Sequence, residues 1–229
     1  MKPQIHRIIK LTETQLIFKL HTAAQMYSSY ADTTLLFIFS KGKESPYGTY
    51  EATFYQYNFM HLAGIKSQTM SAQKFYEACL NGTIKSEDCS PTHSLNNMYE
   101  KVSVINNLLD FKHSKCYRIG EKNLITKDND FELATGNSSG VIGYDHRISQ
   151  KGSKKLNRNI NAMPTTLLAT PITQLVSNPE KIMFILQKPI QEKRYQKILY
   201  EIKKGLLRDN YSLLPQNIQN SICCYNSEF

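Results

Sequence analysis

The chain has 229 residues, of which 41% are hydrophobic and 21% charged. This composition excludes a disordered or collagen-like chain, and no stretch approaches the roughly 20 apolar residues that a membrane span needs. Lys and Arg number 28 against 19 Asp and Glu, and the resulting net charge of +9 suits an anionic partner. Five cysteines without metal-binding spacing favour a reducing compartment, so we expect a cytoplasmic protein.

The N-terminal half predicts helices on either side of two strands. Apolar residues at helical spacing open the chain, and two apolar or aromatic runs joined by a turn predict an antiparallel pair of strands. Two later helices have a serine placed to cap them. The expected elements are helices over 5–27, from Ser71 to about 80 and from Ser94 to about Phe111, and strands over 34–39 and 50–59.

The C-terminal half predicts a β-meander, because short strand-forming runs alternate with Gly- and Asn-rich turns. The expected strands are 116–119, 123–126, 131–134, 141–144 and 182–187, with a polar loop over 151–161 and a basic amphipathic helix over about 191–209. These elements predict an α+β fold, with N-terminal helices and packed helices around a mainly antiparallel sheet of four to six strands. No long linker interrupts the chain, so we expect one domain over residues 1–229.

The segment Asn58–Lys66 (NFMHLAGIK) contains the first candidate for chemistry. We expect His61 to lie where an aromatic strand ends, with Gly64 turning the backbone and Lys66 supplying a cation. Histidine is suited to proton transfer near neutral pH, and a lysine can stabilise charge that develops on a phosphate. The alternative is a half-buried histidine that hydrogen-bonds the backbone.

A second candidate is His146-Arg147, which follows the strand over 141–144. An arginine can bind a phosphate through two hydrogen bonds, and Asp145 could orient the neighbouring histidine. The alternative is a solvated loop. The next stretch is strongly basic and would attract a phosphate backbone in a salt-dependent manner, although lysine-rich loops are also common on solvated surfaces. Its cations are Lys151, Lys154, Lys155 and Arg158.

A metal site is not expected. Asp128, Asp130 and Glu132 alternate along the chain, but the glycine and the closing glutamate of an EF-hand loop are missing, so a hairpin turn fits better. No other metal or cofactor motif occurs, and phosphodiester chemistry would therefore have to use protein side chains.

Several segments together resemble a known family. LLFIFSKG, an aromatic strand, NFMHLAGIK and SAQKFYEACLNG follow one another, and Ile142-Gly143-Tyr144 and Pro164–Leu168 come later. Over about residues 30–190 this succession resembles the phage-associated Barnase–EndoU–colicin–RelE-like (BECR) nuclease domains. Ala63 replaces a threonine of the family pattern, and Thr165-Thr166 offer hydroxyls where the family has serine.

The resemblance implies a compact α+β domain with a four-stranded antiparallel sheet that forms an RNA-binding cleft. It implies a metal-independent ribonuclease without cofactors, acting as a toxin or in conflicts between mobile elements and hosts. His61 would be its acid or base, with Lys66 as the electrostatic group and His146, Arg147 and Thr166 as further candidates. The alternatives are a non-catalytic RNA- or protein-binding module and an inhibitor of a host factor. The expected partners are accordingly RNA and either an antitoxin or a host protein, and no membrane. The resemblance to a phage-associated family also implies that the protein acts in the cytoplasm of a bacterial host cell.

Overall fold

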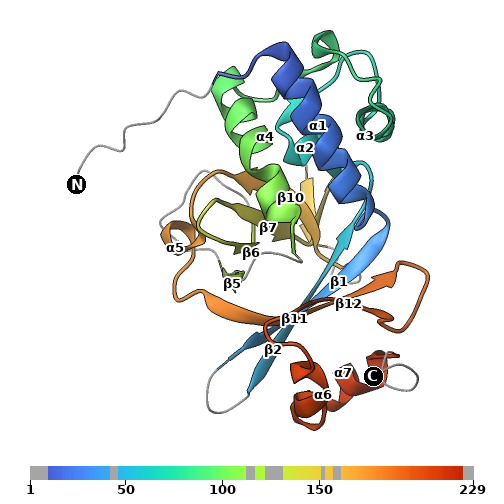
Figure 1. Cartoon of the computed structure of the whole chain (residues 1–229), viewed down its shortest axis with the longest axis vertical. Coiled ribbons are helices and arrows are strands. Elements are labelled where there is room, and N and C mark those ends of the chain that lie inside the picture. Colours follow the sequence, from blue (N-terminus) through green and yellow to red (C-terminus); the bar gives the residue numbers. More distant parts are fainter. Residues whose placement is uncertain are drawn as a thin grey trace.

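Helices gather at one end of a curled antiparallel sheet in the computed structural model (Figure 1). The structure describes residues 10–41, 46–111, 117–121, 131–150, 153–156 and 161–223, and of 147–150 and 153–156 it describes the backbone. Two helices, α1 (Glu13–Ser28) and α4 (Leu95–Leu109), lie side by side over the sheet. The short C-terminal helices lie at the opposite end of the molecule (Figure 1). They are α6 (Leu206–Asn210), η2 (Tyr211–Leu213) and α7 (Gln216–Ser221).

Hydroxyl side chains cap the three longest described helices. Ser71 accepts a hydrogen bond from the backbone N of Lys74 at the start of α3 (Ala72–Leu80), and Ser94 accepts one from Asn97 at the start of α4. Thr12 and Gln15 form a reciprocal capping box on α1. Such caps satisfy N–H groups that have no partner within the helix. The predicted helices that begin near Ser71 and Ser94 are thereby confirmed. The first predicted helix is confirmed over α1, whereas the described residues 10–12 that precede it are not helical.

The main sheet has eight strands and is antiparallel. Its order is β10 (Met163–Leu168), β7 (Val141–Asp145), β6 (Leu133–Gly136), β5 (Arg118–Glu121), β11 (Glu180–Pro189), β1 (Thr33–Ser40) and β2 (Tyr47–Phe54), with β12 (Lys197–Glu201) also on β11. The two ends of this order meet, because Ala52 of β2 forms a bridge to Ala162 beside β10. The backbone N of Thr53 donates to the Ala162 oxygen at 2.7 Å. The sheet therefore curls until its first and last strands touch.

Buried aromatic rings fill the space between the curled sheet and the helices. Tyr144 of β7 contacts Phe37 of β1 and Phe54 of β2, with ring centroids 5.8 and 6.1 Å apart. On the helical side, Tyr27 contacts Phe59 at 5.5 Å. All five side chains are fully buried, and burial of such a side chain contributes about 1.5–3 kcal/mol. This core fixes the segment that follows β2, which carries His61.

The predicted fold class is confirmed, but the expected count of four to six strands is too low. One reason is β12, which lies where the sequence predicted a basic helix. The pairing of β12 with β11 shifts register at Leu199, so Leu199 and Tyr200 are buried in succession. Consecutive buried residues break the alternation of a regular strand and imitate helical spacing. The helix predicted over 191–209 is therefore wrong over β12, and only α6 is helical there.

Two further boundaries differ from the prediction. The strand expected over 50–59 ends at Phe54, and residues 58–62 form the short helix α2 (Asn58–Leu62). The Asn58 side chain accepts a hydrogen bond from the backbone N of Tyr55, which favours a turn over a continued strand. The expected polar loop contains β9 (Ser153–Leu156), which pairs with β8 (Arg147–Gln150). The strand expected over 123–126 lies outside the described residues.

Candidate active site

His61 lies in the last turn of α2, on the side that faces solvent. Asn58, Phe59 and Leu62 of the same helix are buried and hold it against the core. The helix packs on β10 and on α3. His61 is therefore an exposed side chain on a firmly packed element, which is the arrangement that a proton-transferring group needs.

Gly64 allows a lysine of another helix to come close to this segment. Its φ is +71°, a conformation that L side chains rarely adopt. A Cβ at this position would lie 2.8 Å from Cδ of Lys101. The absence of a side chain thus lets the stem of Lys101 run along the backbone three residues after His61.

Lys101 occupies the buried face of α4, one turn after Met98 and one turn before Ile105. It is 6% exposed, and burial lowers the pKa of its ammonium group. No hydrogen bond or salt bridge to its Nζ is found within the described part of the chain. An ammonium group that is partly removed from water, with no carboxylate partner among the described residues, attracts an anion strongly.

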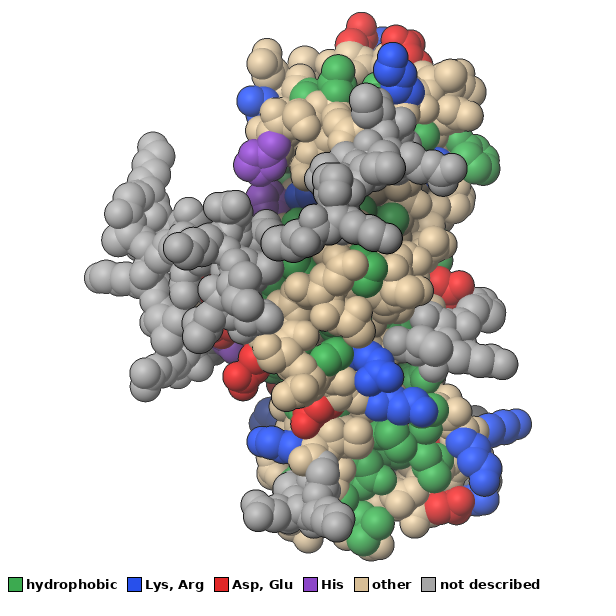
Figure 2. All heavy atoms as spheres, turned by 90° about the vertical axis from the view of Figure 1, so that its left-hand side faces the viewer, with side chains coloured by type: hydrophobic (Ala, Val, Ile, Leu, Met, Phe, Trp, Pro, Cys, Tyr) green, Lys and Arg blue, Asp and Glu red, His purple; other side chains and the backbone are tan. Residues whose placement is uncertain are grey.

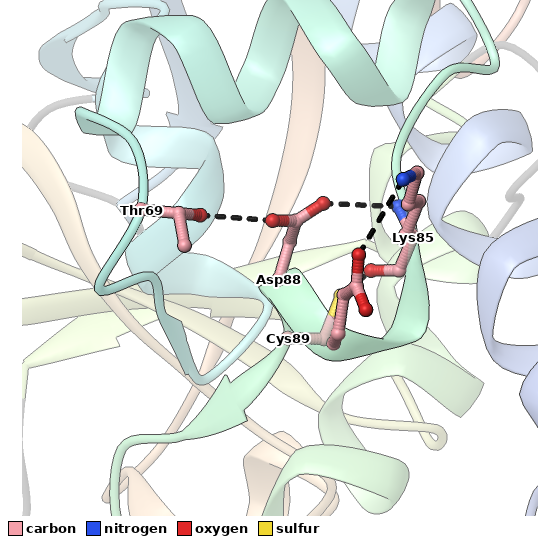
Figure 3. A network of polar contacts seen from close by, with 5 residues as sticks. Thr69, Lys85, Asp88 and Cys89 are labelled. Atoms are coloured by element: carbon pink, nitrogen blue, oxygen red, sulfur yellow. Dashed lines mark hydrogen bonds and ion pairs between the residues drawn. The ribbon is translucent and has the colours of Figure 1, made fainter.

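A polar network holds the segment between α3 and α4, which carries His93 (Figure 3). Asp88 of η1 (Ser86–Asp88) accepts hydrogen bonds from the Thr69 hydroxyl at 2.8 Å and from the backbone N of Lys85 at 3.2 Å. The Cys89 thiol donates to the Lys85 carbonyl. After this network, β4 (Ser90–Pro91) pairs with β3 (Ile65–Lys66).

His93 lies two residues after β4. The backbone N of Thr92 donates to the oxygen of Gly64 at 2.9 Å, which ties the residue before His93 to the residue three positions after His61. His93 is exposed, like His61. The two histidines and Lys101 therefore lie around the Gly64 backbone, near enough for the charges of Lys101 and His93 to act on His61, although they come from three separate segments.

The surroundings of His61 favour its neutral form. Partial burial of the ring has the largest effect and lowers the pKa of His61, and the charges of Lys101 and His93 lower it further. A hydrogen bond with the backbone of Thr165 has the opposite effect. A histidine with a lowered pKa is neutral at physiological pH and can accept a proton.

A second histidine site lies at the end of β7. His146 Nδ1 is 2.7 Å from Oε2 of Glu132, and both side chains are about one third exposed. The Tyr50 ring lies edge-on to His146, with centroids 6.1 Å apart, and its buried hydroxyl has no hydrogen-bond partner in the described structure. This contact fixes the orientation of the imidazole through its Nδ1.

The pairing of β10 with β7 places the two histidine sites beside neighbouring strands. Thr165, beside His61, adjoins Thr166, which pairs with Gly143 of β7. His146 lies three residues beyond Gly143, about 10 Å along an extended chain. Figure 2 shows histidine side chains at two places on one face, the upper beside a lysine or arginine and the lower beside acidic side chains.

The other residues singled out from the sequence lie in different places. Lys66 is exposed in β3, and the charges that act on His61 are those of Lys101 and His93. Thr166 is half-buried in β10. The backbones of Arg147, Lys154 and Lys155 belong to β8 and β9, but their side chains lie outside the described part, as do Lys151 and Arg158 altogether.

Exposed cations of the described chain also gather near its C-terminal end. Figure 2 shows lysine and arginine side chains in the lower half, where Figure 1 places β12 and α6. The exposed members of this group are Lys193, Arg194, Lys197, Lys203, Lys204 and Arg208. In Figure 1, β12 and α6 lie away from α2, towards the C-terminal end of the chain.

Sequence reasoning missed His93 and Lys101. One signal for Lys101 was present, because this lysine interrupts an apolar face formed by Met98, Val102 and Ile105. A charge on the buried face of a helix is unusual and points to a function or a partner. His93 had no comparable signal, since its position beside His61 depends on the pairing of β3 with β4.

Two kinds of feature are not found within the described ranges. No three His, Cys, Asp or Glu side chains there come together as a group that could hold a metal ion. None of the helices described is both long and apolar enough to cross a membrane.

Comparison with known proteins agrees with the family resemblance. The family model for the phage-Barnase-EndoU-ColicinE5/D-RelE like nuclease4 matches residues 19–204, which is most of the chain. No curated protein and no solved structure matches the sequence. The match includes α2, α4, β7 and β10, and therefore both histidine sites. The chain belongs to the phage-Barnase-EndoU-ColicinE5/D-RelE like nuclease4 family.

Proposed function

We propose that this nuclease-family protein is an RNA endonuclease that uses side-chain acid/base chemistry without a metal, as a toxin or in conflicts between mobile elements and hosts. The observation that carries the proposal is the meeting of His61, His93 and Lys101 around the Gly64 backbone. Two exposed imidazoles and one partly desolvated ammonium group supply a base, an acid and a cation. These are the three groups that cleavage next to a ribose 2′-hydroxyl requires.

Each group has a defined role in the proposed reaction. Neutral His61 accepts the proton of the 2′-hydroxyl, and the 2′-oxygen attacks the adjacent phosphorus. Lys101 stabilises the negative charge of the pentavalent phosphorane. Protonated His93 donates its proton to the leaving 5′-oxygen as the phosphorus–oxygen bond breaks. The products are a 2′,3′-cyclic phosphate and a free 5′-hydroxyl, so protons and charges balance.

The remaining candidates take no part in the proton transfers of this proposal. Lys66 is an exposed cation close in sequence to His61. Thr166, His146 and Arg147 belong to or follow the paired strands β10 and β7. The basic residues Lys151, Lys154, Lys155 and Arg158 would bind the phosphates that flank the cleaved bond.

The loss of a family threonine does not favour a non-catalytic protein. Ala63, which stands at that position, is fully buried beside the core residue Leu62. A hydroxyl there would face the interior, away from an RNA at the surface. Two alternative functions remain possible results of the test below. They are a non-catalytic RNA- or protein-binding module and an inhibitor of a host factor.

The test is cleavage of total cellular RNA by the purified protein in excess EDTA. We expect cleavage by the wild type, and a rate lower by about 10²- to 10⁴-fold in His61→Ala and in His93→Ala, since positioned acid/base groups contribute this much. His21→Ala is the matched control, because His21 lies on α1 and hydrogen-bonds Cys79 and Gln25. Salt-sensitive binding without cleavage would contradict the proposal in favour of a binding module. Inhibition of a host enzyme without RNA affinity would favour the inhibitor.

A further inference from the structure

Two tyrosines form a stacked pair immediately before α2. The rings of Tyr55 and Tyr57 have centroids 5.1 Å apart and planes only 8° from parallel. Tyr57 is 47% exposed, although most large hydrophobic side chains of the described chain are buried. Since one face of its ring lies against Tyr55, its opposite face and its edge account for the exposed area.

The exposed tyrosine lies on the same side of α2 as His61. Tyr57 has helical backbone angles, φ −67° and ψ −17°, and precedes His61 by four residues. Residues four apart on a helix have Cβ atoms about 5–6 Å from one another. The buried residues Asn58, Phe59 and Leu62 occupy the opposite side of the helix. An exposed aromatic ring therefore adjoins the proposed phosphate site.

Hydrogen bonds from other segments anchor the backbone around Tyr55 and Gln56. The Tyr27 hydroxyl donates to the Tyr55 carbonyl at 2.8 Å, and the Asn58 side chain accepts from the Tyr55 backbone N at 2.9 Å. The Gln56 side chain donates to Asp32 at 2.7 Å. Rings on an anchored backbone lose little conformational freedom when a ligand stacks on them.

We infer that Tyr57 is a stacking platform for an unpaired nucleobase of the RNA substrate, next to the phosphate held by His61 and Lys101. This inference rests on the proposed function. An unpaired base presents a flat face that stacks on an aromatic ring whatever its sequence, and its phosphate would lie one helical turn away at the cationic group. A paired base is already stacked within its helix, so the platform selects single-stranded RNA.

The inference is tested by binding of a short single-stranded oligoribonucleotide that contains 2-aminopurine, whose fluorescence falls when the base stacks. The protein carries His61→Ala so that the probe stays intact. We expect the fluorescence of 2-aminopurine to be quenched when this protein binds. When Tyr57→Ala is added, the quenching should be lost and the dissociation constant should rise by roughly 5- to 100-fold, as for the loss of one base–aromatic stack. Tyr57→Phe keeps the ring and should retain both signals.

The control is Phe18→Ala, which removes another exposed aromatic side chain, 68% exposed on α1, and should change neither signal. An abasic nucleotide in place of 2-aminopurine should remove the difference between Tyr57 and Tyr57→Ala proteins. Equal affinity for a blunt duplex, or unchanged quenching in Tyr57→Ala, would overturn the inference. The proposed function is tested by a separate readout. If the wild-type protein does not cleave RNA while 2-aminopurine quenching persists, the proposed function fails and the stacking platform stands.

Discussion

The two histidine sites of this protein differ in the charges that surround them. His61 faces Lys101 and His93, whereas His146 faces the carboxylate of Glu132 at 2.7 Å. Cations favour a neutral imidazole and attract a phosphate, while a carboxylate orients the ring and repels a phosphate. Under the proposed function, the surrounding charges, more than the histidine itself, distinguish the catalytic imidazole from the other one. The predictions below test this difference.

The largest expected effect separates the two histidines directly. His61→Ala should lower the RNA cleavage rate by about 10²- to 10⁴-fold, because it removes the proposed base. His146→Ala and Glu132→Gln should keep most of the rate, because their pair lies at the other site. Initial rates on one oligoribonucleotide measure both. Equal losses in His61→Ala and His146→Ala would contradict the distinction and place both imidazoles at one phosphate.

Lys101→Met should separate activity from stability. We expect the cleavage rate to fall by about 10²- to 10³-fold, because a preorganised charge is lost at the phosphate. The free energy of unfolding should rise by about 1 kcal/mol, because methionine fills a similar space without a desolvated charge. Urea unfolding measures the stability. Lys74→Met, at an exposed position of α3, is the control and should change neither quantity. A less stable Lys101→Met protein with full activity would contradict the role of Lys101.

Two glycines with the same backbone conformation test the approach of Lys101. Gly64 and Gly82 have φ values of +71° and +69°, so alanine at either position should lower the free energy of unfolding by about 1 kcal/mol. Only a Cβ at Gly64 meets Lys101, whereas at Gly82 the nearest atoms are 3.6 Å away. Gly64→Ala alone should therefore also lower the cleavage rate, by about tenfold to 100-fold, because small displacements of catalytic groups are costly. Equal rates in the two variants would contradict this account.

The smallest effect is a shift in the titration of His61. The pKa of His61 lies below the ordinary histidine value of 6.5. The proposed base therefore stays neutral in the pH range just below 6.5, and we expect activity to persist there. The stability linked to this group is present above that pH and decreases as the pH falls toward the lowered pKa. Lys101→Met removes one of the lowering charges and should raise the pKa of His61, as followed by NMR of the imidazole protons. An unchanged or lower pKa would contradict the coupling.

Local signals in the sequence were sufficient for the capped helices and for most central strands. Ser71 and Ser94 mark their helices because a cap depends on residues within one turn. β12 was misread because a bulge at Leu199 breaks its alternation. The contact between β2 and β10 joins Ala52 to Ala162, and no local pattern specifies a contact so distant in the chain.

The candidate site was predictable only in part. His61 stood out through its residue type and the glycine after it, yet the sequence placed it at the end of a strand rather than in α2. Lys101 and His93 join it through the close approach at Gly64 and the pairing of β3 with β4. Both depend on tertiary packing, so residue spacing alone could not bring the three groups together.

The chemistry of the cleaved ends tests whether the ribose 2′-oxygen attacks the phosphate. The wild-type protein is incubated in excess EDTA with a single-stranded oligoribonucleotide, and with the same oligonucleotide carrying a 2′-deoxy sugar at the cleavage position. We expect a 2′,3′-cyclic phosphate and a 5′-hydroxyl from the first, and no cleavage of the second at that position. Cleavage of the deoxy-substituted bond, or products with 5′-phosphate ends, would contradict attack by the 2′-oxygen.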